Sequence, residues 1–304
     1  MSDQSAIKLK QNSSTHWEQL HAIALHPNSE LAASSGSRPD KHAPQITVFS
    51  THDGATKYTL TNAPDTVTSL LFANDKQIVA GHENGQVSIW AFDKKNASPT
   101  TLDAHSDAVT ALAVSADGKT FFSCGKDGRI RGWSVTDGQS TDVQYVWPAG
   151  VPAYTLVADP KGGWLAAAGE DAIIRVFDQA TGEVTREMPG HNGAIYTMIM
   201  HPHEYRLISA GEDRSIMLWY LQGEVEFEDR APKDTHEAAI RSMALGPIYQ
   251  DANGEDIPPR LFTSSDDKTI KIWPLANKRK PKTITDGKGV HTSLVALKHD
   301  DGTR

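Results

Sequence analysis

The stretch HNGAIYTMIMHPHEYRLISAGEDRSIMLW, residues 191–219, contains the features that decide the fold. A histidine begins it, the run AIYTMIM follows, and a turn with proline leads to a second run, RLISAG. The turn residue Asp213 comes next, and a third run ends at Trp219. Alternation of apolar and polar residues is typical of half-buried strands, and Pro, Asp and Gly favour the reversals between them. The stretch therefore predicts three short strands joined by turns.

The same order of features recurs along the chain, with copies about 43 residues apart. The aromatic residues that end the third runs are Trp90, Trp133, Phe177, Trp219 and Trp273. At one fixed spacing before them stand the polar turn residues Asn84, Asp127, Asp171, Asp213 and Asp267. A weaker fourth run closes each unit, such as TKYTL (56–60) and DVQYV (142–146). Four strands per unit predict the blade of a β-propeller, which is an all-β fold.

These units resemble the WD40-repeat family, whose repeats share a network of His, Ser or Thr, Asp and Trp. Three units have the whole set: His105, Ser123, Asp127, Trp133; His191, Ser209, Asp213, Trp219; and His236, Thr263, Asp267, Trp273. A buried aspartate needs hydrogen-bond partners, and a histidine bonded to a hydroxyl, with an indole N–H beyond it, provides such a chain. We interpret the twelve residues as a structural network. The unit around Asn84 and the one around Phe177 depart from the pattern, and there we expect apolar packing to contribute more.

The resemblance implies a single WD40-type β-propeller domain over residues 1–304. We expect six complete four-stranded blades over 16–285, with AIKLK (6–10) as a closing strand. Residues 286–304 contain HTSLVAL, which looks like the first strand of a seventh blade, so the fold would be seven-bladed if completed. We favour a natural protein that continues past Arg304. Insertion of strands by a partner chain and closure by six blades alone are the alternatives, because an open strand edge invites pairing.

Bulk composition narrows the class of protein. The net charge of −8 disfavours broad nucleic-acid binding, which needs a basic surface. A single cysteine permits no intramolecular disulfide, which favours a reducing, cytoplasmic location. No apolar stretch is long enough to span a membrane, and the first residues lack the apolar core of a signal peptide.

Catalytic and metal-binding interpretations are weak. Histidine, serine and aspartate occur together in hydrolases, but here the trio recurs in three units, as a structural motif would and an active site would not. His201 and His203 form a close pair without a third ligand at useful spacing. We therefore expect no catalytic residue, no metal and no cofactor.

The entrance of the central channel is the more promising surface, because partners of similar propellers dock there. Two repeating positions are expected to point to it. The first is the residue after the first apolar position of each first strand: His21, Thr68, Thr110, Tyr154, Tyr196 and Arg241. The second is the residue before each turn residue: Glu83, Lys126, Glu170, Glu212 and Asp266. Tyrosine and arginine are frequent in binding hot spots, and four of the five residues in the second set are acidic.

The sequence thus predicts a non-enzymatic scaffold that binds a protein or a basic peptide at this entrance, with Tyr154 and Tyr196 as anchors and Glu170 and Glu212 as charge partners. The alternative is a recognition or regulatory propeller within a larger enzyme whose catalytic part lies outside this chain. A partner or a downstream segment would complete the seventh blade. A loop over 246–260 that includes Tyr249 and Ile257 is a further candidate contact, and an unstructured connection is equally compatible with its sequence.

Overall fold

A computed structural model describes most of the chain. It covers residues 19–37, 44–94, 98–136, 138–145, 147–148, 150–201, 205–221, 227–229, 236–246, 249–250, 256–257, 259–275, 281–285 and 294. The predicted closing strand 6–10 and the predicted seventh blade, apart from Leu294, lie outside these residues, as does His16.

The described strands form six antiparallel four-stranded sheets, here called blades 1 to 6. Blade 1 contains β1 (Gln19–Leu25), β2 (Leu31–Ser37), β3 (Ile46–Ser50) and β4 (Thr56–Leu60). Blade 2 contains β5 (Val67–Asn74), β6 (Gln77–His82), β7 (Gln86–Ala91) and β8 (Thr100–Asp103). Blade 3 contains β9 (Val109–Val114), β10 (Thr120–Gly125), β11 (Ile130–Ser134) and β12 (Ser140–Gln144).

The second half of the chain repeats this order. Blade 4 contains β13 (Ala153–Ala158), β14 (Trp164–Gly169), β15 (Ile173–Asp178) and β16 (Val184–Pro189). Blade 5 contains β17 (Ile195–Met200), β18 (Arg206–Gly211), β19 (Ile216–Tyr220) and β20 (Phe227–Asp229). Blade 6 contains β21 (Ile240–Leu245), β24 (Arg260–Ser265), β25 (Thr269–Pro274) and β26 (Lys282–Thr285).

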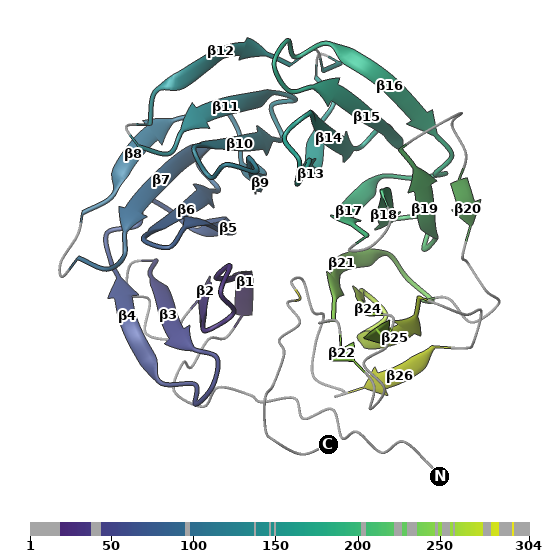
Figure 1. Cartoon of the computed structure of the whole chain (residues 1–304), viewed down its shortest axis with the longest axis horizontal. Coiled ribbons are helices and arrows are strands. Elements are labelled where there is room, and N and C mark those ends of the chain that lie inside the picture. The colour runs from purple at the N-terminus through teal and green to yellow at the C-terminus, as the bar shows by residue number, and fades with distance from the viewer. Residues whose placement is uncertain are drawn as a thin grey trace.

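The six blades stand around a central axis, with the first strand of each blade innermost and the fourth at the rim (Figure 1). Each inner strand packs against the next, in the order β1, β5, β9, β13, β17 and β21. The fold is therefore an all-β propeller. No helix in the described part of the chain has the length and apolarity needed to cross a membrane.

Burial follows from the composition of the strands. The second strands β10, β14 and β18 are buried after their first position, where they consist of apolar and small residues. Small side chains such as Ala166 and Ala168 let the neighbouring blade approach, and they share one apolar cluster with Ile195 and Trp219 of blade 5. The outer strands β4 and β8 are mostly exposed, as expected for strands with one face in water.

Two local predictions differ from the structure. Strand β12 begins at Ser140, before the run 142–146 that was predicted as the fourth strand of its blade. The predicted loop 246–260 contains a two-stranded ribbon, β22 (Tyr249–Gln250) with β23 (Asp256–Ile257), in which Tyr249 pairs with Ile257. The ribbon strands are too short to give a periodic pattern, which explains why the sequence did not predict them.

One hydrogen bond concerns the predicted seventh blade. The backbone N–H of Leu294 donates to the hydroxyl of Ser242 on β21, at 3.0 Å. A bond of the same kind links two complete blades, where the N–H of Met198 on β17 donates to the hydroxyl of Thr155 on β13, at 3.1 Å. Leu294 thus meets blade 6 through the same type of contact by which blade 5 meets blade 4.

Candidate functional site

Every inner strand carries a β-bulge near its start. The pairing with the second strand skips one residue in each blade, for example Tyr154 between Ala153 and Thr155. The skipped residues are His21, Thr68, Thr110, Tyr154, Tyr196 and Arg241. A bulge leaves its extra residue out of the ladder and redirects its side chain. The first set of residues predicted from the repeat therefore occupies one structurally distinct position.

The second set also shares a position. In five blades the residue before the turn residue donates its backbone N–H to a carbonyl just ahead of the inner strand, with N···O distances of 2.8–3.0 Å. The donors are Glu83, Lys126, Glu170, Glu212 and Asp266. This bond holds each side chain at the same edge of its blade as the bulge. The side chains of Glu83, Lys126, Glu170 and Glu212 are exposed.

In blades 4 to 6 the two sets meet. Tyr154 donates its hydroxyl to Glu170 at 2.7 Å, and its ring lies 5.5 Å from that of Tyr196, centroid to centroid. The guanidinium carbon of Arg241 lies 4.4 Å from the centre of the Tyr196 ring. We call Tyr154, Tyr196, Arg241, Glu170, Glu212 and Asp266 the entrance cluster.

Arg241 is fixed by its own blade. Its Nε lies 3.0 and 2.9 Å from the two carboxylate oxygens of Asp266, and its Nη2 lies 2.6 Å from one of them. These bonds to Asp266 raise the pKa of Arg241 against the opposing effect of burial. Burial, and then the hydrogen bond to Glu170, raise the pKa of Tyr154, so the phenol stays protonated and donates. The cluster is thus ordered without a ligand.

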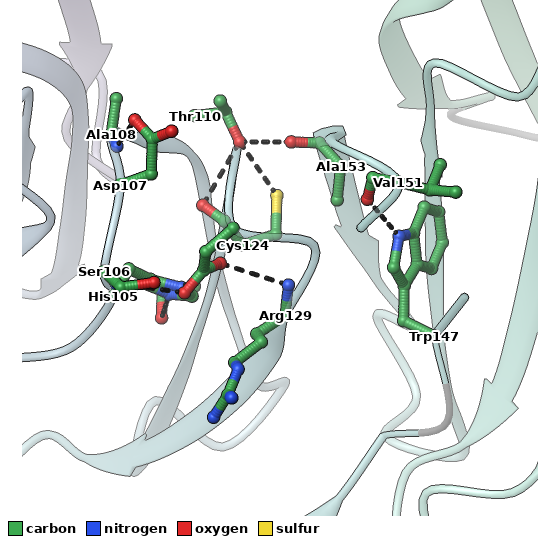
Figure 2. Close-up of polar contacts among 12 residues, drawn as sticks. His105, Ser106, Asp107, Ala108, Thr110, Cys124, Arg129, Trp147, Val151 and Ala153 are labelled. Carbon is green, nitrogen blue, oxygen red and sulfur yellow. Dashed lines mark hydrogen bonds and ion pairs between the residues drawn. The ribbon is translucent and has the colours of Figure 1, made fainter. Parts of the chain in front are cut away.

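The bulged residues of blades 2 and 3 serve a different role. The Thr68 hydroxyl lies 2.5 Å from the carbonyl oxygen of Val109, and the Thr110 hydroxyl lies 2.5 Å from that of Ala153. Each threonine thereby links its blade to the next one, as Figure 2 shows for Thr110. Glu83 and Lys126 lie in these two blades, so the structure places them on the same surface beside the entrance cluster rather than within it.

The residues of the predicted network lie together in all three blades. In blade 5, Nδ1 of His191 lies 2.8 Å from Asp213, Nε2 lies 2.7 Å from the Ser209 hydroxyl, and the indole N–H of Trp219 donates to the same hydroxyl at 2.7 Å. His105, Ser123, Asp127 and Trp133 make the equivalent contacts in blade 3 at 2.8–2.9 Å. His236, Thr263, Asp267 and Trp273 do so in blade 6 at 2.7–2.9 Å.

This geometry is structural in kind. The hydroxyl-bearing residues Ser123, Ser209 and Thr263 are fully buried, so a substrate has no access to them. Burial lowers the pKa of His105 and of His236 although their aspartate partners act in the opposite direction. Neutral imidazoles of this kind accept from the hydroxyl and donate to the carboxylate. Among the described residues, no group of three His, Cys, Asp or Glu side chains is placed to hold a metal ion.

Blades 2 and 4 have polar contacts that the sequence did not predict, in addition to the apolar packing expected there. In blade 2, Nε2 of His82 lies 2.8 Å from the Ser88 hydroxyl, and Nδ1 lies 3.0 Å from the carbonyl oxygen of Asp65. This histidine comes from the second strand and not from the turn before the first. The sequence did contain a signal for this contact, because the unit lacks a histidine before its first strand and has one, His82, at the end of its second strand.

Blade 4 uses an arginine. Arg175 of β15 is buried, contacts Asp171 at 2.7 Å and Glu187 at 2.9 Å, and lies 5.0 Å from the ring centre of Trp147. The indole of Trp147 in turn donates to the carbonyl of Val151 at 2.8 Å (Figure 2). A guanidinium thus takes the place of the imidazole opposite the turn aspartate.

Radial four-stranded blades with this recurring network define the chain as a repeat-built β-propeller. A family model described as WD domain, G-beta repeat matches residues 97–134, 182–220 and 233–274. These are the three stretches that hold the complete networks. Together with the fold, these matches support the WD40-repeat β-propeller family for this chain.

The known proteins that are similar to this chain have names that describe different kinds of protein. The zinc finger CCCH domain-containing protein 17 of Oryza sativa subsp. japonica is 28% identical over 192 residues, which cover 63% of this chain and 40% of that protein. The target of rapamycin complex subunit wat1 of Schizosaccharomyces pombe is 24% identical over 225 residues, which cover 72% of this chain and 68% of that protein. This chain spans less than half the length of the rice protein.

A solved structure shares the fold. The crystal structure of RRP9 WD40 repeats matches with a TM-score of 0.73 and 19% identity, and the match covers 92% of this chain and 84% of that chain. Propellers of this family are generally interaction modules without catalytic activity.

Proposed function

We propose that this chain is a protein-interaction platform that binds a basic peptide segment of a partner at the entrance cluster. One observation carries the proposal. The bulged side chains of three successive blades, Tyr154, Tyr196 and Arg241, touch in a row, and carboxylates stand beside them. Aromatic and arginine side chains held rigid at a surface are typical of hot spots, because little conformational entropy is lost when a partner binds.

Charge supports a basic partner. Asp266 neutralises Arg241 within the cluster, whereas Glu170 and Glu212 are exposed acids. The whole chain has a net charge of −8, so its field attracts cations from a distance. The same charge disfavours a nucleic-acid partner.

The comparisons are compatible with a role inside a larger assembly. The Schizosaccharomyces pombe relative is, by its name, a subunit of a complex. The rice relative extends far beyond the segment matched by this chain. A second candidate function follows from that length, namely a recognition module of a longer protein. It would use the same surface.

A paired substitution tests the proposal. Tyr196→Ala with Glu212→Lys removes one ring and reverses one charge at the cluster, so binding of a labelled pool of basic peptides should fall at least about tenfold. Binding is measured by fluorescence anisotropy, after thermal unfolding has shown that the variant is folded. Thr68→Ala with Glu83→Lys makes a matched change in blade 2 and should leave most of the binding intact. Full binding by the blade 5 variant would place the site elsewhere.

A further inference from the structure

In blade 6, the guanidinium of the chain's own Arg241 contacts both an aromatic ring and a carboxylate. The guanidinium carbon of Arg241 lies 4.4 Å from the centre of the Tyr196 ring, and both oxygens of Asp266 accept from the guanidinium. Planar stacking on an aromatic ring and a forked bond to a carboxylate are the two features that distinguish guanidinium from ammonium binding. Here the two repeating positions described above supply the aromatic ring beneath the guanidinium and the carboxylate that accepts from it.

Blades 4 and 5 present the same two positions with different occupants. The bulge position holds Tyr154 in blade 4 and Tyr196 in blade 5, and the turn position holds Glu170 and Glu212. At these two positions, each of these blades therefore has a ring and a carboxylate but no cation. Among the described residues, the cation over Tyr196 comes from blade 6, and none lies over Tyr154.

The carboxylates of blades 4 and 5 both affect the hydroxyl of Tyr154. Glu170 accepts from the Tyr154 hydroxyl, and the charge of Glu212 also contributes to the raised pKa of Tyr154. Glu212 accepts a single backbone N–H, from Ala194 at 3.2 Å. Glu170 and Glu212 are both exposed and hold the same turn position in neighbouring blades, so they leave negative charge that a cationic side chain can offset.

We infer that the entrance cluster takes an arginine side chain of the partner, with its guanidinium against Tyr154 and its N–H groups forked to Glu170 and Glu212. The inference rests on the proposed function and specifies its ligand. Arginine fits better than lysine, because a guanidinium is planar, less strongly hydrated and able to donate to two carboxylates at once. An anionic ligand does not fit, because Asp266 already occupies the guanidinium of Arg241.

Three short peptides test the ligand class. Acetyl-Ala-Arg-Ala-amide, its lysine analogue and its citrulline analogue are titrated into the full chain at up to millimolar concentration, with saturation-transfer NMR as the readout. We expect the arginine peptide to bind at least about fivefold more tightly than the lysine peptide. Citrulline keeps the shape of arginine without its charge and should not bind. A fourth peptide, in which the arginine is dimethylated, retains the charge but blocks the fork, and should bind more weakly.

Two matched variants locate the site. Glu212→Gln removes one charge from the cluster and should weaken the arginine peptide about fivefold or more, whereas Glu83→Gln removes one charge from the same surface in blade 2 and should have little effect. Unfolding curves check that both variants are folded.

The outcomes separate the inference from the proposed function. Equal binding of arginine and lysine peptides, with both weakened by Glu212→Gln, overturns the arginine inference and leaves a general basic-peptide platform. Equal effects of Glu212→Gln and Glu83→Gln also overturn it, because binding would then follow net charge alone. If neither the short peptides nor the basic peptide pool binds, both proposals fail.

Discussion

At the scale of single residues, one hydroxyl decides whether a buried indole is satisfied. In blades 3, 5 and 6, the tryptophan donates its N–H to Ser123, Ser209 or Thr263. In blade 2, Ala80 occupies the corresponding place on the second strand, judged from the pairing register. The N–H of Trp90 is fully buried there and has no partner among the described residues. Two otherwise similar tryptophans thus differ in one bond.

This difference gives a matched test. Trp219→Phe removes a donor that Ser209 uses, whereas Trp90→Phe removes a donor that has no acceptor. Both rings are fully buried, so the two variants lose similar apolar area. We expect Trp219→Phe to lower the free energy of unfolding by about 1 kcal/mol more than Trp90→Phe. Urea unfolding followed by circular dichroism measures both, and equal losses would contradict the prediction.

The network also predicts a pH dependence. Burial lowers the pKa of His105 and His236, so the unfolded chain takes up protons at these residues before the folded chain does. Their contribution to stability is complete above about pH 6.5 and is lost as the pH falls through the lowered folded pKa values. Burial alone would raise the pKa of Asp267, but bonds from Thr269, the Glu237 N–H and His236 hold it at about 2.

Acidification should therefore destabilise the fold in two steps. The histidine step begins below about pH 6.5, and the Asp267 step follows between about pH 3.8 and the folded pKa. Urea midpoints across this range measure both steps. The variant His236→Asn should show a shallower first step. A rise in stability between neutral pH and about pH 5 would contradict the assignment.

At the scale of strands and blades, the repeat pattern predicted more than single propensities would. The strand positions and the two sets at the entrance follow from the recurrence, because each position has the same neighbours in every blade. The contact of Arg241 with Tyr196 of the preceding blade could not be read from the pattern, since it depends on how one blade leans against the next. The roles of His82 and Arg175 were not predicted for a related reason. Each makes the polar contacts of its blade from a position that the repeat pattern does not assign to the network histidine.

Blade 4 provides a prediction at this scale. Asp171→Ala would leave the buried guanidinium of Arg175 with Glu187 alone, and we expect a loss of about 1–3 kcal/mol in unfolding free energy. Arg175→Met should cost less, because Asp171 and Glu187 regain contact with water and methionine fills the space beside Trp147. Chemical denaturation of the two variants shows which of them loses more unfolding free energy. A larger loss for Arg175→Met would mean that the ion pairs are strongly net stabilising.

At the scale of the whole molecule, the six blades follow one another around the axis, and Leu294 is held on the inner strand of the last one. The bond from its N–H to Ser242 repeats the bond from Met198 to Thr155 between blades 4 and 5. We propose that Leu294 stands at the inner-strand position of a seventh blade, as the sequence predicts for HTSLVAL.

Hydrogen exchange tests this position. Ser242→Ala removes the acceptor for the Leu294 amide, so that amide should exchange about tenfold faster, which corresponds to the loss of one hydrogen bond. Thr155→Ala is the matched control and should accelerate the Met198 amide in the same way. Mass spectrometry with fragmentation resolves both amides. An unchanged Leu294 amide in Ser242→Ala would contradict the assignment.

The threonine contact between blades 3 and 4 has one more consequence. Cys124 is the single cysteine of the chain, its side chain is fully buried, and its sulfur lies 3.3 Å from the Thr110 hydroxyl that bonds to Ala153. Burial raises the pKa of its thiol to about 12, so the folded chain should react with thiol reagents only when these blades separate. We expect native labelling to be at least about a hundredfold slower than labelling in urea. Comparable rates would show that the seam is open. The labelling rate of Cys124 therefore reports how often blades 3 and 4 separate. A ligand that holds blades 4 to 6 against blade 3 would lower this rate.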